Sequence, residues 1–227
     1  MSWKEIWHKK YTVKEEHSHV NAGFDYLSIK QWINLVNIFT DLLDVNEYAD
    51  VLDVGCGQGA FLEQIKEYKS ISGVDYSEKA IIKIKTLMNG NFRVSEANNL
   101  PFNDNSFDTV ICFSVFHYFN SVNYSKEVIN ELVRVTKPLG QILIGDIKDF
   151  DKKDIYFSTR LRENRGTVQQ VKSVTTDHQF YKKDLFLDIA KTNNLKIQVI
   201  DESELDLSYY SSSNYRFSVV YKKQIKK

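Results

Sequence analysis

The spacing of apolar residues changes in character about 45 residues into the chain. Before that point it is helical: Trp3, Ile6 and Trp7 fall on one stripe of a short amphipathic segment, and a second amphipathic helix is predicted over about 28–43. Beyond it, short apolar runs alternate with amphipathic stretches. This alternation predicts strands over about 49–54, 71–75, 92–95, 107–113, 141–146, 195–201 and 215–221, and helices over about 60–69, 80–88, 127–135 and 181–191.

The order of these elements predicts an α/β architecture. Strands that alternate with helices of this length form crossover units, which place helices on both faces of a mainly parallel sheet. Only polar residues join the last two predicted strands, so we expect the last strand to run antiparallel. The prediction is a doubly wound, seven-stranded sheet over 46–227, preceded by a helical segment over 1–45 that can act as a lid.

Residues 148–180 fit no element of this alternation and are interpreted as an insertion after the fifth strand, placed to cover a site. The insertion contains Arg160, Arg162 and Arg165. We interpret these arginines first as solvated surface charges and second as contacts for an anionic acceptor.

Composition narrows the class of protein. The 227 residues include 30 Lys and Arg against 30 Asp and Glu, so the chain lacks the basic surplus of a nucleic-acid-binding protein. The two cysteines, Cys56 and Cys112, offer no disulfide framework, and the N-terminus lacks the apolar run of a signal peptide, so a cytoplasmic location is expected. His8, His17 and His19 have no cysteine or carboxylate set beside them, so no metal site is predicted.

The segment from Val51 to Gly59, Val-Leu-Asp-Val-Gly-Cys-Gly-Gln-Gly, carries the clearest chemical signal. A predicted strand runs into a turn with glycine at alternate positions. Glycines let a backbone approach a ligand closely, and in open α/β sheets ligands bind beyond the carboxyl ends of the strands. Asp75 ends the next strand, where its carboxylate can accept hydrogen bonds from both hydroxyls of a ribose. The loop therefore predicts a cofactor that contains a nucleoside.

Two cofactors fit this loop. Gly55, Gly57 and Ala60 satisfy the spacing found in nicotinamide-dinucleotide enzymes. Three features favour S-adenosylmethionine instead. Asp53 places a carboxylate at the strand end, where it can meet a cationic amino group, and the glycines alternate as far as Gly59. The Tyr and Lys four residues apart that a short-chain dehydrogenase needs do not occur downstream of the loop.

Further motifs follow in an order that resembles the class I S-adenosylmethionine-dependent methyltransferases of the small-molecule type. They lie within about 50–146: the loop at 51–59, Gly-Val-Asp-Tyr-Ser at 73–77, Glu-Ala-Asn-Asn-Leu-Pro-Phe at 96–102, Ser-Phe-Asp-Thr-Val at 106–110, and Glu-Leu-Val-Arg-Val followed by Lys-Pro at 131–138. The resemblance implies a Rossmann-like fold, methyl transfer from S-adenosylmethionine with S-adenosylhomocysteine as product, and an N-terminal segment that covers the cofactor.

The resemblance also assigns roles to residues of the cofactor site. Asp53, Gly55 and Gly57 are expected at the methionine end, and Asp75 at the ribose. The full set of residues expected to bind the cofactor is Asp53, Gly55, Cys56, Gly57, Gly59, Asp75, Tyr76, Glu96, Ala97 and Ser114.

The methyl acceptor is inferred by elimination. The motifs of DNA amino-methylating enzymes, of carbon-5 methylating enzymes and of metal-dependent catechol enzymes are missing after the fourth and fifth strands. A hydroxyl or amine of a small molecule, such as a sugar or secondary metabolite, is left, with no nucleic acid and no membrane as partner. For a hydroxyl, His117 is the predicted base and Asp146 its orienting partner or a hydrogen-bond partner of the substrate. For an amine acceptor, which is already nucleophilic, the protein would only have to position the amine, and no base would be needed. A nicotinamide-dependent oxidoreductase and a non-catalytic cofactor-binding protein of the same fold stay open as alternatives.

Overall fold

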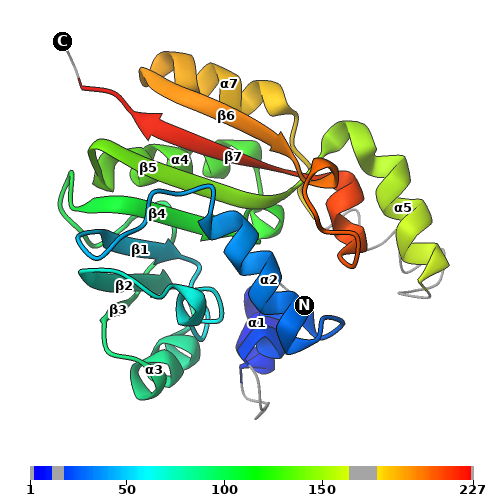
Figure 1. The fold of residues 1–227 in the computed structure, drawn as a ribbon, viewed down its shortest axis with the longest axis horizontal. Coiled ribbons are helices and arrows are strands. Elements are labelled where there is room, and N and C mark those ends of the chain that lie inside the picture. The colour runs from blue at the N-terminus through cyan, green and yellow to red at the C-terminus, as the bar shows by residue number, and fades with distance from the viewer. Residues whose placement is uncertain (1–2, 12–17, 164–177, 226–227) are drawn as a thin grey trace.

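The computed structural model describes residues 3–11, 18–163 and 178–225, and it contains one seven-stranded sheet (Figure 1). The strand order is β3-β2-β1-β4-β5-β7-β6, and the pairings are parallel except those of β7, which runs antiparallel to both of its neighbours. The strands are β1 Asp50–Val54, β2 Ser70–Asp75, β3 Asn91–Val94, β4 Phe107–Phe113, β5 Thr136–Lys148, β6 Leu195–Asp201 and β7 Arg216–Lys223. The predicted fold class is confirmed, including the antiparallel last strand.

Helices cover both faces of this sheet. One core joins β1 and β4 to α4 and α7, and a second core joins the opposite faces of the same strands to α2 and α3. The alternation along β4 makes this visible, since Val110 and Cys112 face the first core while Ile111 and Phe113 face the second. The α-helices are α1 Trp3–Lys10, α2 Ile29–Thr40, α3 Glu78–Leu87, α4 Val122–Val135, α5 Lys153–Arg162 and α7 Lys183–Thr192; shorter turns of helix are η1 Val20–Phe24, η2 Leu62–Gln64, η3 Phe116–Tyr118, η4 Phe150–Lys152, η5 Glu202–Glu204 and η6 Ser211–Tyr215.

Local signals in the sequence explain where several helices begin. The Ser28 side chain accepts a hydrogen bond from the Gln31 amide at the start of α2, and the Gln31 side chain accepts one from the Ser28 amide, which makes a capping box. Ser77 caps α3, with its hydroxyl accepting from the Ala80 amide. Ser121 caps α4, which is longer than the helix predicted from its hydrophobic stripe.

The helix predicted over 60–69 is wrong. Only the single 3-10 turn η2 forms there, and the chain then continues without regular secondary structure into β2. The Ala60 carbonyl accepts a hydrogen bond from the indole of Trp32 at 3.2 Å, so it is not used for the amide of Gln64, as an α-helix would require. The apolar side chains of Phe61, Leu62 and Ile65 are buried at helical spacing, which explains the prediction, but the backbone does not continue as a helix.

The segment after β5 is better ordered than its sequence pattern predicted. It begins with η4 and α5, and after the undescribed residues it returns at His178 to the carboxyl end of the sheet, where Gln179 donates its amide to the His117 carbonyl. Arg165 lies outside the described residues. No helix in the described parts of the chain combines the length and apolarity needed to cross a membrane.

Candidate functional site

A cavity of about 550 Å³ lies at the carboxyl ends of β1, β2 and β4, where the topology predicts a ligand site. The strand ends and the turns that follow them form one wall. The other wall comes from α1, the chain after it, and α2. The residues that line the cavity are Trp3, Ile6, Trp7, Tyr11, Ala22, Phe24, Trp32, Asp53, Val54, Gly55, Cys56, Gly57, Ala60, Phe61, Val74, Asp75, Tyr76, Ser95, Glu96, Ala97, Phe113, Ser114, Val115, Tyr118, Phe119, Asn120 and Tyr124.

The glycine loop is held by hydrogen bonds to β2. The amides of Gly55 and Cys56 both donate to the Val74 carbonyl, at 2.8 and 3.0 Å, and the amide of Gly57 donates to Asp75 Oδ2 at 3.0 Å. Gly55 has a φ of +81°, and a Cβ at this position would lie 2.5 Å from a methyl group of Val115, so only glycine fits here. The loop amides are thus used inside the protein before any ligand binds.

Two buried carboxylates face the cavity from neighbouring strands. Burial raises the pKa of Asp53 to about 8, and the nearby Asp75 adds to the shift. Burial also raises the pKa of Asp75, to about 6, although the amides of Ser77 and Gly57 donate to its carboxylate and oppose the shift. A cationic ligand would relieve the repulsion between the two groups and favour their ionised forms.

The turn after β3 brings Glu96 and Ala97 to the cavity next to Tyr76. Tyr124, near the start of α4, also lines the cavity, and its hydroxyl donates to Glu96 Oε2 at 3.2 Å. Burial, followed by the charge of Glu96, raises the pKa of this phenol to about 12, so it is protonated at neutral pH and able to donate. This end of the cavity can hold a planar ring and bind its polar edge.

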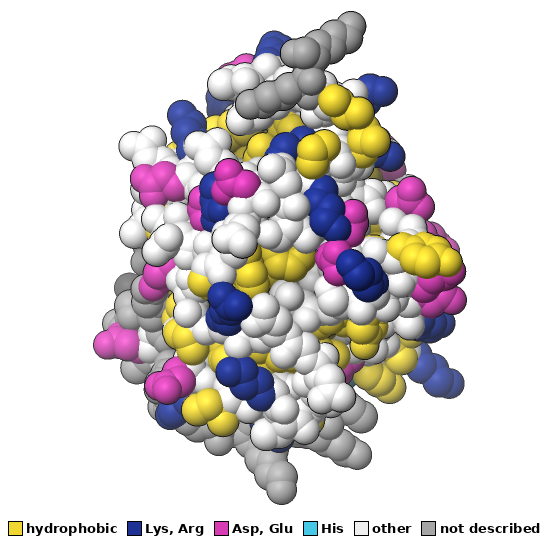
Figure 2. Space-filling view, turned by 90° about the vertical axis from the view of Figure 1, so that its left-hand side faces the viewer, with side chains coloured by type: hydrophobic (Ala, Val, Ile, Leu, Met, Phe, Trp, Pro, Cys, Tyr) yellow, Lys and Arg dark blue, Asp and Glu magenta, His cyan; other side chains and the backbone are white. Residues whose placement is uncertain are grey.

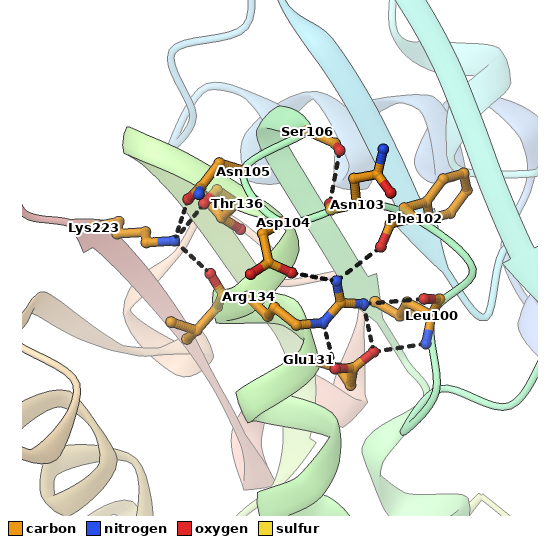
Figure 3. A network of polar contacts seen from close by, with 11 residues as sticks. Leu100, Phe102, Asn103, Asp104, Asn105, Ser106, Glu131, Arg134, Thr136 and Lys223 are labelled. Carbon is orange, nitrogen blue, oxygen red and sulfur yellow. Dashed lines mark hydrogen bonds and ion pairs between the residues drawn. The ribbon is translucent and has the colours of Figure 1, made fainter.

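A network of polar contacts between α4 and residues 100–106 holds in place the segment that follows Glu96 and Ala97 (Figure 3). Arg134 on α4 donates to the carbonyls of Phe102 and Leu100, at 2.8 and 3.0 Å, and forms an ion pair with Glu131. Glu131 accepts from the Leu100 amide at 2.7 Å. The Glu-Leu-Val-Arg-Val motif therefore positions the cavity wall without touching the cavity itself.

The N-terminal segment supplies an aromatic wall. Trp3, Trp7 and Tyr11 line the cavity from α1 and its C-terminal end, and Trp7 packs edge-on against Tyr118 with ring centroids 5.3 Å apart. A Cβ on Gly57 would lie 2.8 Å from the Tyr11 hydroxyl, so this phenol lies directly over the glycine loop. Together with Phe24, these aromatic side chains enclose the cavity opposite the strand ends.

The two predicted catalytic residues lie near the strand ends but outside the cavity wall. His117 is only 2% exposed, and burial, with the charge of Lys148 second, holds its pKa well below the usual range. The Asp146 carboxylate forms an ion pair with Arg216 and accepts a hydrogen bond from the Tyr210 hydroxyl at 2.6 Å. In the described structure no hydrogen bond joins the side chains of His117 and Asp146, so the expected dyad is not formed there. The base role of His117 stays a prediction.

The other predicted site residues are brought together, with one difference. All the residues predicted to bind the cofactor line the cavity except Gly59, which has a φ of +92° and packs against Ile84 of α3. Sequence reasoning missed Tyr124 and Tyr118, which no local motif marked. The described residues contain no group of three or more His, Cys, Asp or Glu side chains placed to bind a metal.

Comparison with protein families and curated proteins agrees with this site. Residues 52–144 match the model of a family described as a methyltransferase domain. The chain is 34% identical over 125 residues to an uncharacterised methyltransferase of Schizosaccharomyces pombe, covering 53% of this chain and 46% of that protein. It is 37% identical over 94 residues to the tRNA (carboxymethyluridine(34)-5-O)-methyltransferase of Arabidopsis thaliana, covering 41% and 23%. The chain thus spans less than half the length of these relatives.

Among solved structures, the chain is similar in fold to the methyltransferase in a Haloferax volcanii complex with the Trm112 methyltransferase activator. The TM-score is 0.67 at 15% sequence identity, and the match covers 96% of this chain and 98% of the other. At this identity the likeness concerns the fold.

Proposed function

We propose that the chain is a class I S-adenosylmethionine-dependent methyltransferase, which the match of residues 52–144 to a methyltransferase-domain family supports, and that it transfers the methyl group of S-adenosylmethionine to a hydroxyl or amine of a small molecule. The cofactor supplies a methyl group already activated by its sulfonium. The residues of the chain have to bind the cofactor, hold the acceptor in line with that methyl group and exclude water.

The observation that carries the proposal is the charge of the cavity wall. Asp53, Asp75 and Glu96 line it, and none of the described lining residues is a lysine or arginine. S-adenosylmethionine carries a sulfonium and an ammonium group, so an acidic wall suits it. The Asp53 carboxylate would meet the ammonium group, and Asp75 would accept from the ribose hydroxyls.

The same wall argues against a nicotinamide cofactor. A dinucleotide needs free loop amides and a helix N-terminus for its pyrophosphate. Here the amides of Gly55, Cys56 and Gly57 already donate to Val74 and Asp75 of β2, and the helix predicted after the loop is reduced to the turn η2. A pyrophosphate would also approach the buried acids Asp53 and Asp75.

Acceptor chemistry is proposed from the same lining. The aromatic side chains Trp3, Trp7 and Phe24 offer flat apolar surface in the same cavity as Ser114, which follows β4, and this favours a small acceptor with an apolar body. Since the His117 ring lies outside the wall, we propose that positioning contributes more to the rate than proton removal by this residue. We further propose that α1 acts as a lid, because Trp3 and Trp7 of this helix and Tyr11 just after it line the cavity.

The charge balance of the chain supports a small molecule over a nucleic acid as acceptor, although several relatives are named as tRNA methyltransferases or probable ones. On the face at the amino ends of the parallel strands, which lies opposite the cavity, basic and acidic side chains are interspersed (Figure 2). This agrees with the equal numbers of acidic and basic residues in the chain.

The test is a comparison of ligands followed by a turnover assay. S-adenosylhomocysteine should raise the melting temperature by mass action, while NADH should not. Stabilisation by NADH alone would contradict the proposal. A protein that binds S-adenosylhomocysteine but transfers no label from radioactive S-adenosylmethionine to any small hydroxyl or amine acceptor would instead be a non-catalytic binder.

A further inference from the structure

A second group of buried ionisable side chains lies at the ends of β5 and β7, and the proposed reaction does not use it. We call Lys148, Arg216, His178 and Tyr156 the cationic cluster. Lys148 is 2% exposed and Arg216 is 8% exposed, so both charges are removed from water. Burying a charge is costly unless a partner compensates it, which makes the partners of these two residues informative.

Lys148 and Arg216 are neighbours on adjacent strands. Lys148 and Arg216 are directly opposite in the antiparallel pairing of β5 and β7, so their side chains leave the same face of the sheet. Like charges in this position destabilise a strand pair. Burial, with the charge of Arg216 second, holds the pKa of Lys148 well below its usual range.

The nearby acids balance only one of these cations. Asp146 forms an ion pair with Arg216. Burial raises the pKa of Glu202 to about 8, with the Asp146 charge second, so Glu202 is mostly protonated at neutral pH. Asp149 is paired with Lys183 at 3.4 Å. Among the described residues, no carboxylate lies within ion-pair distance of Lys148, whose amine instead contacts His178 Nδ1 at 2.5 Å.

Three further donors of the cluster point to a missing anion. Arg216 Nε, the Tyr156 hydroxyl and His178 Nε2 are buried and have no hydrogen-bond partner in the described structure. With Nδ1 accepting from Lys148, the neutral imidazole of His178 carries its proton on Nε2 and is a donor there. Unsatisfied buried donors cost free energy, and an oxyanion would satisfy donors without adding another cation.

The cluster borders the cavity at the acceptor end. The His178 ring stacks on Trp3 with centroids 4.5 Å apart and planes 7° apart, and it meets the edge of Tyr118 at 5.5 Å. Trp3 and Tyr118 both line the cavity. A layer of aromatic rings thus connects the cavity wall to Lys148, and Trp3 of this layer belongs to α1.

We propose that the cationic cluster is the subsite for an anionic group, a carboxylate or phosphate, of the methyl acceptor. The inference rests on the proposed function, because it takes the neighbouring cavity as the site of methyl transfer. The acceptor reaches Lys148 when Trp3 moves off His178, and its oxyanion then accepts from Lys148, Arg216 and His178.

The test uses aromatic acids as probes on the full-length protein saturated with S-adenosylhomocysteine. Benzoate and phenyl phosphate are compared with the neutral benzamide and phenol by thermal shift. We expect at least one of the two anions to raise the melting temperature, and neither neutral compound to do so. Stabilisation by benzoate would indicate a carboxylate subsite, and stabilisation by phenyl phosphate would indicate a phosphate subsite. No stabilisation by either anion, or equal stabilisation by its neutral analogue, would overturn the proposal.

Substitutions at two lysines of the β5–β7 pair test whether the stabilisation by the anion depends on Lys148. Lys148→Met should weaken the anion at least about tenfold, the effect of losing one charge-assisted hydrogen bond, and Lys148→Arg should restore binding in part. Lys222→Met is the matched control, since Lys222 is exposed and lies at the other end of the β5–β7 pairing. Undiminished anion binding in Lys148→Met would refute the subsite.

Stability separates this role from a structural one. Replacing a buried cation that faces Arg216 with an apolar side chain of similar length should leave the ligand-free melting temperature unchanged or raise it. A lower melting temperature would show that Lys148 serves the fold and would count against the subsite. The S-adenosylhomocysteine shift is measured separately, so its failure would overturn the methyltransferase proposal while the anion effect could still be read on the ligand-free protein.

Discussion

The two ends of the sheet's carboxyl edge have opposite electrostatic character. At β1 and β2, the buried Asp53 and Asp75 face a cavity without cations among its described lining residues. At β5 and β7, the buried Lys148 and Arg216 lie opposite each other, and Asp146 forms an ion pair with Arg216. Burial shifts the pKa of Asp53 upward and that of Lys148 downward, so each end gathers groups of one sign that a ligand of opposite charge would stabilise in their ionised forms. This contrast is what the two proposals use, a cationic cofactor at one end and an anionic acceptor group at the other.

The largest effect is expected at the acidic end. Asp75→Ala should weaken S-adenosylhomocysteine binding by roughly 1–3 kcal/mol, or about 5- to 150-fold in affinity by calorimetry, because the ribose hydroxyls and the amides of Gly57 and Ser77 lose their acceptor. Asp188→Ala, at an exposed position of α7, is the control and should bind normally. Unchanged affinity in Asp75→Ala would remove this residue from the cofactor site.

The next effect depends on pH. Because the pKa of Asp53 is raised to about 8, ligand-free protein holds a proton there that must leave before the carboxylate pairs with an ammonium group. Affinity for S-adenosylhomocysteine should therefore rise by up to about fiftyfold from pH 6 to pH 8, as the ionised fraction of Asp53 grows. Asp53→Asn should bind more weakly and with a flatter pH profile. A wild-type affinity that is flat or falls over this range would argue against the pairing.

The raised pKa of Asp53 also has a consequence for stability. Between about pH 4 and pH 8 the native state holds a proton on this group that the unfolded chain has lost, so its contribution to the free energy of unfolding decreases as pH rises through that window. Asp53→Asn should remove this component of the pH dependence in denaturant titrations.

A smaller effect is expected behind the cavity wall. Arg134→Met breaks the contacts to the Leu100 and Phe102 carbonyls, so we expect a loss of about 1–2 kcal/mol in stability and a few-fold weaker cofactor binding. Lys126→Met, at an exposed position of the same helix, controls for the loss of a charge. Full cofactor affinity together with reduced stability would limit Arg134 to a folding role.

The smallest effect on cofactor affinity is expected for His117→Ala, which should bind S-adenosylhomocysteine as the wild type does. A general base contributes about 10²–10⁴ to a rate. Since the buried ring lies outside the cavity wall, we expect turnover to fall by less than tenfold. A larger fall, with a rate that titrates with one group, would establish the base role.

The acidic end could be predicted from the sequence, and the cationic end could not. Asp53, the glycine loop and Asp75 lie within 25 residues, in a strand-turn-strand pattern whose geometry follows from local sequence. Lys148, His178 and Arg216 come together only through the antiparallel register of β5 with β7 and the return of the chain at His178. Contacts between residues distant in sequence also explain why the helix predicted over 60–69 does not form. The Ala60 carbonyl, which an α-helix would use, accepts a hydrogen bond from the Trp32 indole instead.

The position of α1 has a kinetic consequence. The loop that meets the cofactor is already held by its own hydrogen bonds, so binding requires little ordering of that loop. The aromatic rings of Trp7 and Tyr11, however, line the cavity, and the Tyr11 hydroxyl lies over Gly57. If α1 acts as the proposed lid, exchange of spent for fresh cofactor requires it to move in every cycle, and we expect product release to set the maximal rate. Turnover should fall as solvent viscosity increases, and shortening Trp7 should relieve that dependence.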